Sequence, residues 1–172
     1  MKVINLFGGP GCGKSTTAAG LFFLMKARGH KVELVTEYAK DLTYEKNWMR
    51  LRQQLSVTGE QYARLDRLRG QVDWVVMDSP LLLGAVYAKK QFERTAAIQA
   101  FFDFDNVSFV IDRAKPYQPY GRRQDEESAR HIDDCILLLL DQWHIPADVI
   151  PGNEDGAKVI HDLLFPPLKG HQ

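Results

Sequence analysis

The sequence has few cysteines and no long hydrophobic run. Its two cysteines, Cys12 and Cys135, are too few for a disulfide framework or a zinc site, and they favour a reducing cytoplasm. The longest apolar run, at 135–140, is far shorter than the roughly 18 residues that a membrane-spanning helix needs. The apolar residues that precede the first glycines are also too few for a signal sequence. We therefore expect a cytoplasmic chain with no membrane segment.

The sequence also lacks an excess of either charge. Lys and Arg total 22, and Asp and Glu total 22, so no overall field attracts the chain to nucleic acid or to an anionic membrane. Any contact with DNA would need a local cluster of basic residues. The five histidines are scattered, and none is a convincing ligand or base. A length of 172 residues is typical of one domain, and we expect that domain to span 1–172.

Short apolar runs alternate with helical stretches along the whole chain. Runs rich in β-branched residues predict five strands, at 2–7, 31–36, 72–77, 107–111 and 147–150. The stretches between and after them predict helices at about 14–28, 41–69, 81–103, 124–144 and 155–164. This alternation predicts an α/β fold, with a five-stranded parallel sheet and helices on both faces.

The strongest motif follows the first predicted strand. Residues 8–15, GGPGCGKS, satisfy the P-loop pattern G-x-x-x-x-G-K-[ST], and a predicted helix begins at its end. In this motif backbone N–H groups surround phosphate oxygens, Lys14 interacts with the β- and γ-phosphates, and the Ser15 hydroxyl is a ligand of Mg²⁺. We expect Cys12, at a variable position, to be an inert packing residue. The motif predicts a site for ATP and Mg²⁺ that comprises Gly8, Gly9, Pro10, Gly11, Cys12, Gly13, Lys14, Ser15 and Thr16.

Carboxylates stand at the ends of two other predicted strands. Asp78 ends an apolar strand, as in a Walker B site, where it would hold Mg²⁺ or take a proton from an attacking hydroxyl. Its alternative role is to cap the next helix. Glu37 follows the second strand on the same edge of the sheet, where we expect it to face the acceptor; its alternative is a solvated loop residue. Which of the two is the base stays open.

A basic loop follows the fourth predicted strand. Residues 113–123 hold two prolines, two tyrosines and the arginines Arg122 and Arg123, as expected of a lid that closes over a transferring phosphoryl group. Alternatively, these two arginines pair with the acidic residues at 125–127 on the surface.

A second basic segment, at about 41–69, separates the second strand from the third. Such an insertion covers the acceptor in P-loop kinases, and Trp48 or Tyr62 would stack on a base. Alternatively, the aromatic side chains lie in the core and the arginines in water. A local footprint for DNA would need a cluster made of Arg50, Arg52, Arg64, Arg67 and Arg69.

Four segments in order carry a family resemblance: GGPGCGKST, VTEYAK, MDSPLLL and PYQPYGRRQDEE. Together they resemble P-loop kinases related to the nicotinamide riboside kinase domain of NadR, and more closely the small P-loop "AAA family ATPase" proteins of bacteriophages. The resemblance spans nearly the whole chain and implies ATP with Mg²⁺ as the phosphoryl donor. It places Lys14 and Ser15 at the phosphates, Asp78 near the metal, Glu37 near the acceptor and Arg122 or Arg123 in the lid.

The resemblance also bears on the substrate. Phage relatives include kinases that phosphorylate 5-hydroxymethyluracil in DNA, besides nucleoside and nucleotide kinases, and a phage-encoded chain would work in the host cytoplasm. The sequence lacks the sensor regions and the added helical domain of ring-forming AAA ATPases, so we expect no unfolding motor.

The sequence therefore predicts an ATP-dependent kinase that acts on a hydroxyl of a nucleoside, nucleotide or related nucleobase compound. One alternative is a kinase of 5-hydroxymethyluracil in phage DNA, and the other is a regulatory NTPase without a small-molecule acceptor. The balanced charge favours a free nucleoside or nucleotide over DNA.

Overall fold

A single parallel sheet forms the centre of the protein. The computed structural model describes residues 1–114 and 125–166. Its strands are β1 (Lys2–Phe7), β2 (Val32–Val35), β3 (Trp74–Met77), β4 (Asp105–Asp112) and β5 (Ala147–Pro151). They lie in the order β2-β3-β1-β4-β5, and every neighbouring pair is parallel. The predicted five-stranded parallel sheet is confirmed.

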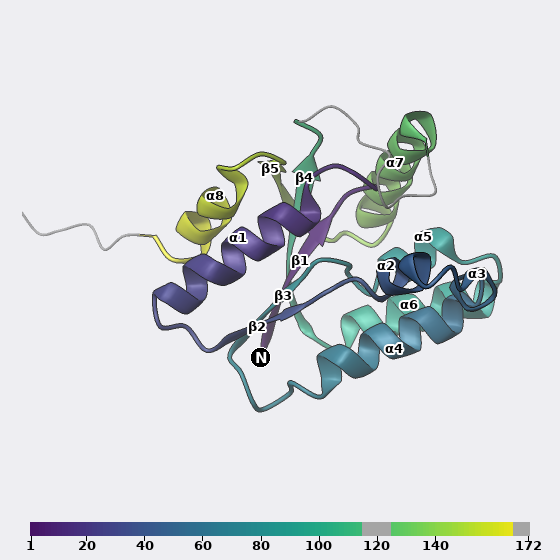
Figure 1. The fold of residues 1–172 in the computed structure, drawn as a ribbon, viewed down its shortest axis with the longest axis horizontal. Coiled ribbons are helices and arrows are strands. Elements are labelled where there is room, and N and C mark those ends of the chain that lie inside the picture. The colour runs from purple at the N-terminus through teal and green to yellow at the C-terminus, as the bar shows by residue number, and fades with distance from the viewer. Residues whose placement is uncertain (115–124, 167–172) are drawn as a thin grey trace, which may run out of the picture.

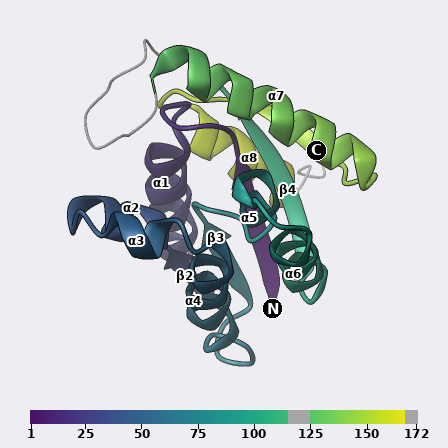
Figure 2. The ribbon, with the colours of Figure 1, turned by 90° about the vertical axis from the view of Figure 1, so that its right-hand side faces the viewer.

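Helices cover both faces of this sheet, as predicted. α1 (Lys14–Ala27) and α8 (Gly156–Leu164) lie on one face, and α4 (Gln54–Asp66), α5 (Leu83–Tyr87), α6 (Gln91–Phe102) and α7 (Glu126–Gln142) lie on the other (Figures 1 and 2). Alternate residues of β1 belong to the two cores: Val3 and Phe7 pack under α4–α7, whereas Ile4 and Leu6 pack under α1 and α8. This alternation follows from the two-residue period of a strand.

The helical stretch predicted at 41–69 is divided into several helices. The structure has three helices there: α2 (Tyr38–Tyr44), α3 (Trp48–Leu51) and α4. The chain turns at Lys46, whose φ of 55° is left-handed, and the Asn47 side chain then accepts a hydrogen bond from the Arg50 N–H and starts α3. An N-cap asparagine offers the backbone this alternative to a continuous helix.

The helical stretch predicted at 81–103 is likewise divided, into two helices. α5 ends at Tyr87, Ala88 is extended, and α6 begins at Gln91. The Glu93 carboxylate accepts hydrogen bonds from the N–H groups of Lys89 and Lys90, at 3.2 Å each, and so stabilises the start of α6. Within the described ranges, no helix is both long and apolar enough to cross a membrane.

The sheet order places three predicted site segments side by side. β1 is followed by the P-loop, β3 by Asp78 and β2 by Glu37, and these strands are neighbours in the order β2-β3-β1. Because the strands are parallel, their carboxyl ends share one edge of the sheet, where ligands of open α/β folds bind.

Candidate functional site

The P-loop connects β1 to α1 with a backbone that requires glycine. Gly8, Gly11 and Gly13 have positive φ values of 145°, 85° and 115°. At Gly13 a Cβ would also come within 2.7 Å of the Gly152 carbonyl oxygen. Glycine has no Cβ, so it tolerates both the positive φ and the close contact. The loop can therefore turn tightly and direct its N–H groups inward at the start of α1. This is the geometry of a phosphate-binding loop.

Lys14 at the end of the loop folds back over it. Its Nζ donates hydrogen bonds to the carbonyl oxygens of Gly8, at 2.7 Å, and Gly9, at 3.0 Å. Burial alone would lower the pKa of Lys14, but Coulombic attraction to the ionised forms of Cys12, Glu37, Asp78 and Tyr87 raises it above its usual value. The ammonium group is therefore charged at neutral pH, as a phosphate ligand must be.

Ser15 and Asp78 form the part of the site that suits a metal ion. The Ser15 hydroxyl donates to Asp78 Oδ2 at 2.8 Å, and Asp78 is only 4% exposed. The other oxygen, Asp78 Oδ1, is buried and makes no hydrogen bond within the described part of the chain. A buried carboxylate oxygen without a partner is costly unless a ligand satisfies it. Mg²⁺ is usually held by one or two protein oxygens together with substrate phosphates and water, and this pair fits it.

Glu37 is held in place by a buried glutamine. Gln61 on α4 is 5% exposed; its Oε1 accepts from the Tyr38 N–H at 2.9 Å, and its Nε2 donates to the Thr36 carbonyl at 3.0 Å. The two bonds fix the backbone on both sides of Glu37. Burial raises the pKa of Glu37 above its usual value, and the attraction of Lys14 opposes this shift.

One cavity joins these residues. It has a volume of about 810 Å³ and extends from the P-loop, past Glu37, to a wall formed by α2–α5. Tyr87, which is 36% exposed, lines it as well. Partial burial raises the pKa of Tyr87 to about 12, with the nearby Glu37 adding to the shift and Lys14 opposing it. The phenol is therefore a hydrogen-bond donor at neutral pH.

An ion pair supports the P-loop from the side of α7. Asp133 Oδ1 accepts from the Gly9 N–H, and Asp133 Oδ2 accepts from Arg113, with the shorter contact at 2.8 Å. The Arg113 guanidinium, only 6% exposed, also donates to the Pro10 carbonyl at 2.9 Å. A Cβ at Gly9 would lie 2.5 Å from the Ala129 carbonyl oxygen, so α7 approaches the loop too closely for a larger residue.

A protein-family model described as an AAA domain matches residues 3–156. The chain belongs to this family. No curated protein sequence matches this AAA-domain chain at a significant level.

Solved structures resemble the AAA-domain chain in fold. A deoxyadenosine kinase from M. mycoides, with the products dCMP and dCDP bound, is 16% identical with a TM-score of 0.62, and the match covers 95% of this chain and 98% of that one. The APS kinase CysC of Mycobacterium tuberculosis, in complex with AMPPNP and APS, is 13% identical with a TM-score of 0.55, over 95% and 96% of the two chains. The AAA-domain chain thus has the P-loop kinase fold.

The structure brings together most of the predicted site residues of the AAA-domain chain. Apart from Gly9 and Cys12, the predicted P-loop residues line the cavity, and so does Glu37. Cys12 is instead buried beneath the loop, as expected of a packing residue. Asp78 reaches the loop through Ser15. Arg122 and Arg123 lie outside the described residues.

The aromatic residues proposed for base stacking are elsewhere. Neither Trp48 nor Tyr62 lines the cavity: Tyr62 packs against Phe104 and donates to Asp103 at 2.7 Å. Tyr44 and Tyr87 line the cavity in their place.

Three of the five arginines proposed as a DNA footprint make contacts within the protein instead: Arg50 and Arg64 both lie against the ring of Tyr38, and Arg69 lies against Phe104. Arg64 pairs with Asp41 and Glu60, and Arg69 pairs with Asp66 and Asp103. Of the five arginines, only Arg52 lines the cavity.

Sequence analysis missed Gln61, Tyr87 and Asp133, and it placed Arg113 at the start of the predicted lid rather than beneath the P-loop. In the sequence, Gln61 cannot be told from an exposed glutamine of a helix, and Asp133 lies among other acidic residues of α7. Neither position therefore carries a local sequence signal. Arg113 does have a local sequence signal, because it directly follows a strand that ends at the carboxyl edge of the sheet.

Proposed function

We propose that the chain is an ATP-dependent phosphotransferase that acts on a hydroxyl of a nucleoside, nucleotide or related nucleobase compound. The observation that carries the proposal is the shared cavity: Lys14 and Ser15 of the P-loop and the carboxylate of Glu37 face the same space of about 810 Å³. A nucleotide switch needs only the phosphate half of such a space. The half beyond Glu37, lined by α2–α5, offers room for a second substrate.

The P-loop half suits the donor. Its N–H groups and Lys14 would bind the β- and γ-phosphates of ATP, and Ser15 and Asp78 would hold Mg²⁺. When bound, Mg²⁺ neutralises charge on the transferring group. Positioning and charge neutralisation account for most of the catalysis of phosphoryl transfer.

The other half suits an alcohol. Glu37 would accept the proton of the acceptor hydroxyl while the acceptor oxygen forms a bond to the γ-phosphorus and the bond to the β-phosphate oxygen breaks, which leaves ADP. The raised pKa of Glu37 makes it a better proton acceptor than an ordinary glutamate, and Gln61 keeps the segment in place. The role of Arg122 and Arg123 stays a prediction: they would stabilise the negative charge of the transferring phosphoryl group.

The similar solved structures support the proposed class of enzyme, a kinase. Both neighbours are named as kinases, one of deoxyadenosine and one of APS. At identities of 16% and 13% they support the fold, and the choice of acceptor rests on the residues of this chain.

The test is transfer of labelled γ-phosphate from ATP to a panel of acceptors: nicotinamide riboside, the deoxynucleosides, their monophosphates, and duplex DNA with or without 5-hydroxymethyluracil. We expect a labelled nucleoside or nucleotide, and none with Lys14→Ala. Label only in the modified duplex would identify a DNA-base kinase. ATP hydrolysis without label in any acceptor would identify a regulatory NTPase and overturn the proposal.

A further inference from the structure

The charge of the cavity differs from the charge of the whole chain. Over the full sequence, 22 basic residues balance 22 acidic ones. Of the described residues that line the cavity, Glu37 is the one acid, whereas Lys14, Lys40, Arg52 and Lys89 are cations. Lys14 belongs to the P-loop and serves the donor phosphates. The other three cations lie on α2, on the turn after α3 and on the turn after α5, around the acceptor half.

These three cations outnumber the one acid among the described residues that line the cavity, Glu37, on which Lys40 acts electrostatically. Neither Lys40, Arg52 nor Lys89 forms an ion pair with any described residue. The contrast with Arg64 and Arg69 is informative, because these arginines of the same insertion do not line the cavity and each pairs with two carboxylates. An excess of charge of one sign in a cavity with low-dielectric walls attracts the opposite charge.

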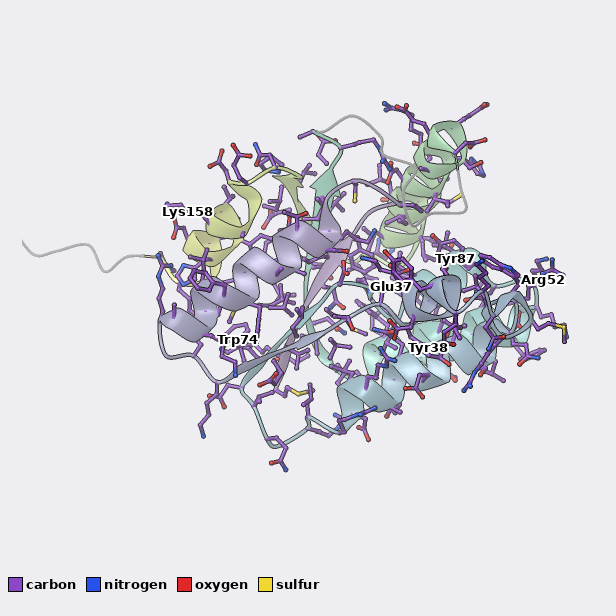
Figure 3. All side chains as sticks on the ribbon, viewed as in Figure 1. Glu37, Tyr38, Arg52, Trp74, Tyr87 and Lys158 are labelled. Atoms are coloured by element: carbon purple, nitrogen blue, oxygen red, sulfur yellow. The ribbon has the colours of Figure 1, made fainter. Side chains whose placement is uncertain are left out.

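The same half of the cavity also has an apolar side. Tyr44, Leu51, Val57 and Leu83 line it, together with the face of Tyr87. Aromatic and aliphatic walls of this kind bind flat rings. In Figure 3, Tyr87 lies between Glu37 and Arg52, and Arg52 is at the outer end near α3.

We propose that the phosphoryl acceptor is a nucleotide unit that already carries a phosphate of its own, and that Arg52 binds this phosphate. The hydroxyl of the acceptor lies at Glu37, its base lies against the apolar wall, and its phosphate lies at the cationic rim formed by Lys40, Arg52 and Lys89. The proposal rests on the proposed function, and it excludes an uncharged nucleoside as the preferred acceptor. A guanidinium forms paired hydrogen bonds with a phosphate, which gives Arg52 the largest part.

Binding tests this inference independently of turnover. The protein, with AMPPNP and Mg²⁺ occupying the donor half, is titrated with each deoxynucleoside and with its 3′- and 5′-monophosphates by calorimetry. For the preferred base, we expect one monophosphate to bind at least tenfold more tightly than the nucleoside, and Arg52→Gln to remove most of that ratio. Arg67→Gln is the matched control, because Arg67 is an exposed arginine of the same insertion that does not line the cavity, and the ratio should persist in it.

Equal affinity for nucleosides and monophosphates would overturn the inference, and so would a ratio that Arg52→Gln leaves unchanged. Transfer assays with the same compounds separate the two proposals. A binding preference without transfer to any acceptor would contradict the proposed function and would leave only a phosphate-binding site at Arg52. Efficient transfer to nucleosides and monophosphates alike would support the proposed function and overturn the inference. A short strand that carries 5-hydroxymethyluracil then distinguishes the two sources of the phosphate, a free nucleotide or a nucleic acid backbone.

Discussion

Gln61 is the residue on which the geometry of Glu37 depends most. Its amide bonds to the backbone at Thr36 and at Tyr38, and both bonds are lost in Gln61→Ala. We expect kcat to fall about tenfold or more, roughly 1.4 kcal/mol of transition-state stabilisation, while the affinity for ATP changes little because the P-loop is untouched. Steady-state kinetics measure both, with the exposed Gln142→Ala as the control. A change in ATP affinity with kcat unchanged would assign Gln61 to nucleotide binding instead.

The pH dependence of the reaction reports on Glu37. Because burial raises the pKa of Glu37, the carboxylate becomes protonated on acidification at a higher pH than an ordinary glutamate would. A protonated Glu37 accepts no proton from the acceptor, so kcat should fall on the acidic side below that raised pKa. A pH–kcat profile should show this acidic limb in the wild type and lose it in Glu37→Gln. An acidic limb that is the same in both proteins would show that another group is the base.

Added metal ions should restore activity to a variant of Asp78 but not to a variant of Glu37. In Asp78→Asn the buried side chain keeps its size and one oxygen, but an NH₂ group replaces the other oxygen and the negative charge is lost. Mg²⁺ therefore binds more weakly, and excess Mg²⁺ or Mn²⁺ should restore part of the activity. Glu37→Gln should gain nothing from added metal, because its defect is in proton transfer. Activity titrations with both metals decide the matter, and equal rescue of the two variants would contradict the separate roles.

Among single residues, those in a contiguous motif could be predicted from the sequence. The P-loop residues are contiguous, so their sequence motif alone identifies the phosphate site. Asp78 and Glu37 could be predicted because the carboxyl ends of parallel strands share one edge of the sheet. Gln61 and Asp133 could not be found this way, since each reaches its partner over long sequence separations, from Gln61 to Tyr38 and from Asp133 to Gly9. Only the packing of α4 and α7 brings these side chains to the site.

At the scale of elements, α7 supports the P-loop through Asp133. In Asp133→Ala the Gly9 N–H loses its acceptor, and the nearly buried Arg113 loses its carboxylate. We expect the free energy of unfolding to fall by about 2 kcal/mol, less than for a fully buried pair, because Asp133 is partly exposed. Urea unfolding measures the loss. The neighbouring Asp134→Ala, at an exposed position, should cost less than about 0.5 kcal/mol, and an equal cost in both variants would contradict this support.

The elements themselves were predictable to different degrees. All five strands were found, because buried parallel strands appear as compact apolar runs. The helical stretches 41–69 and 81–103 were found without their internal breaks, since these breaks depend on a side-chain cap at Asn47 and on the Glu93 carboxylate rather than on proline or glycine. These breaks matter for function, because α2, α3 and α5 turn their ends toward the cavity.

At the scale of the whole molecule, the sheet edge divides the two tasks of a kinase. On the proposed function, the P-loop and α1 would bind the donor, and the segments between β2 and α5 would enclose the acceptor in the same cavity. The chain as a whole has no net charge, but the lining of its cavity carries more cations than acids, which composition alone could not show. Both halves must be filled for the reaction that we propose.

The central claim is that ATP turnover depends on an acceptor at Glu37, and the most direct measurement is the rate of ADP formation with and without acceptor. In the wild type we expect a nucleoside monophosphate to raise this rate at least tenfold, with one phosphorylated product formed for each ADP. Glu37→Gln should lose this stimulation while still binding ATP. An unchanged rate on adding every acceptor in turn, or full stimulation in Glu37→Gln, would contradict the claim.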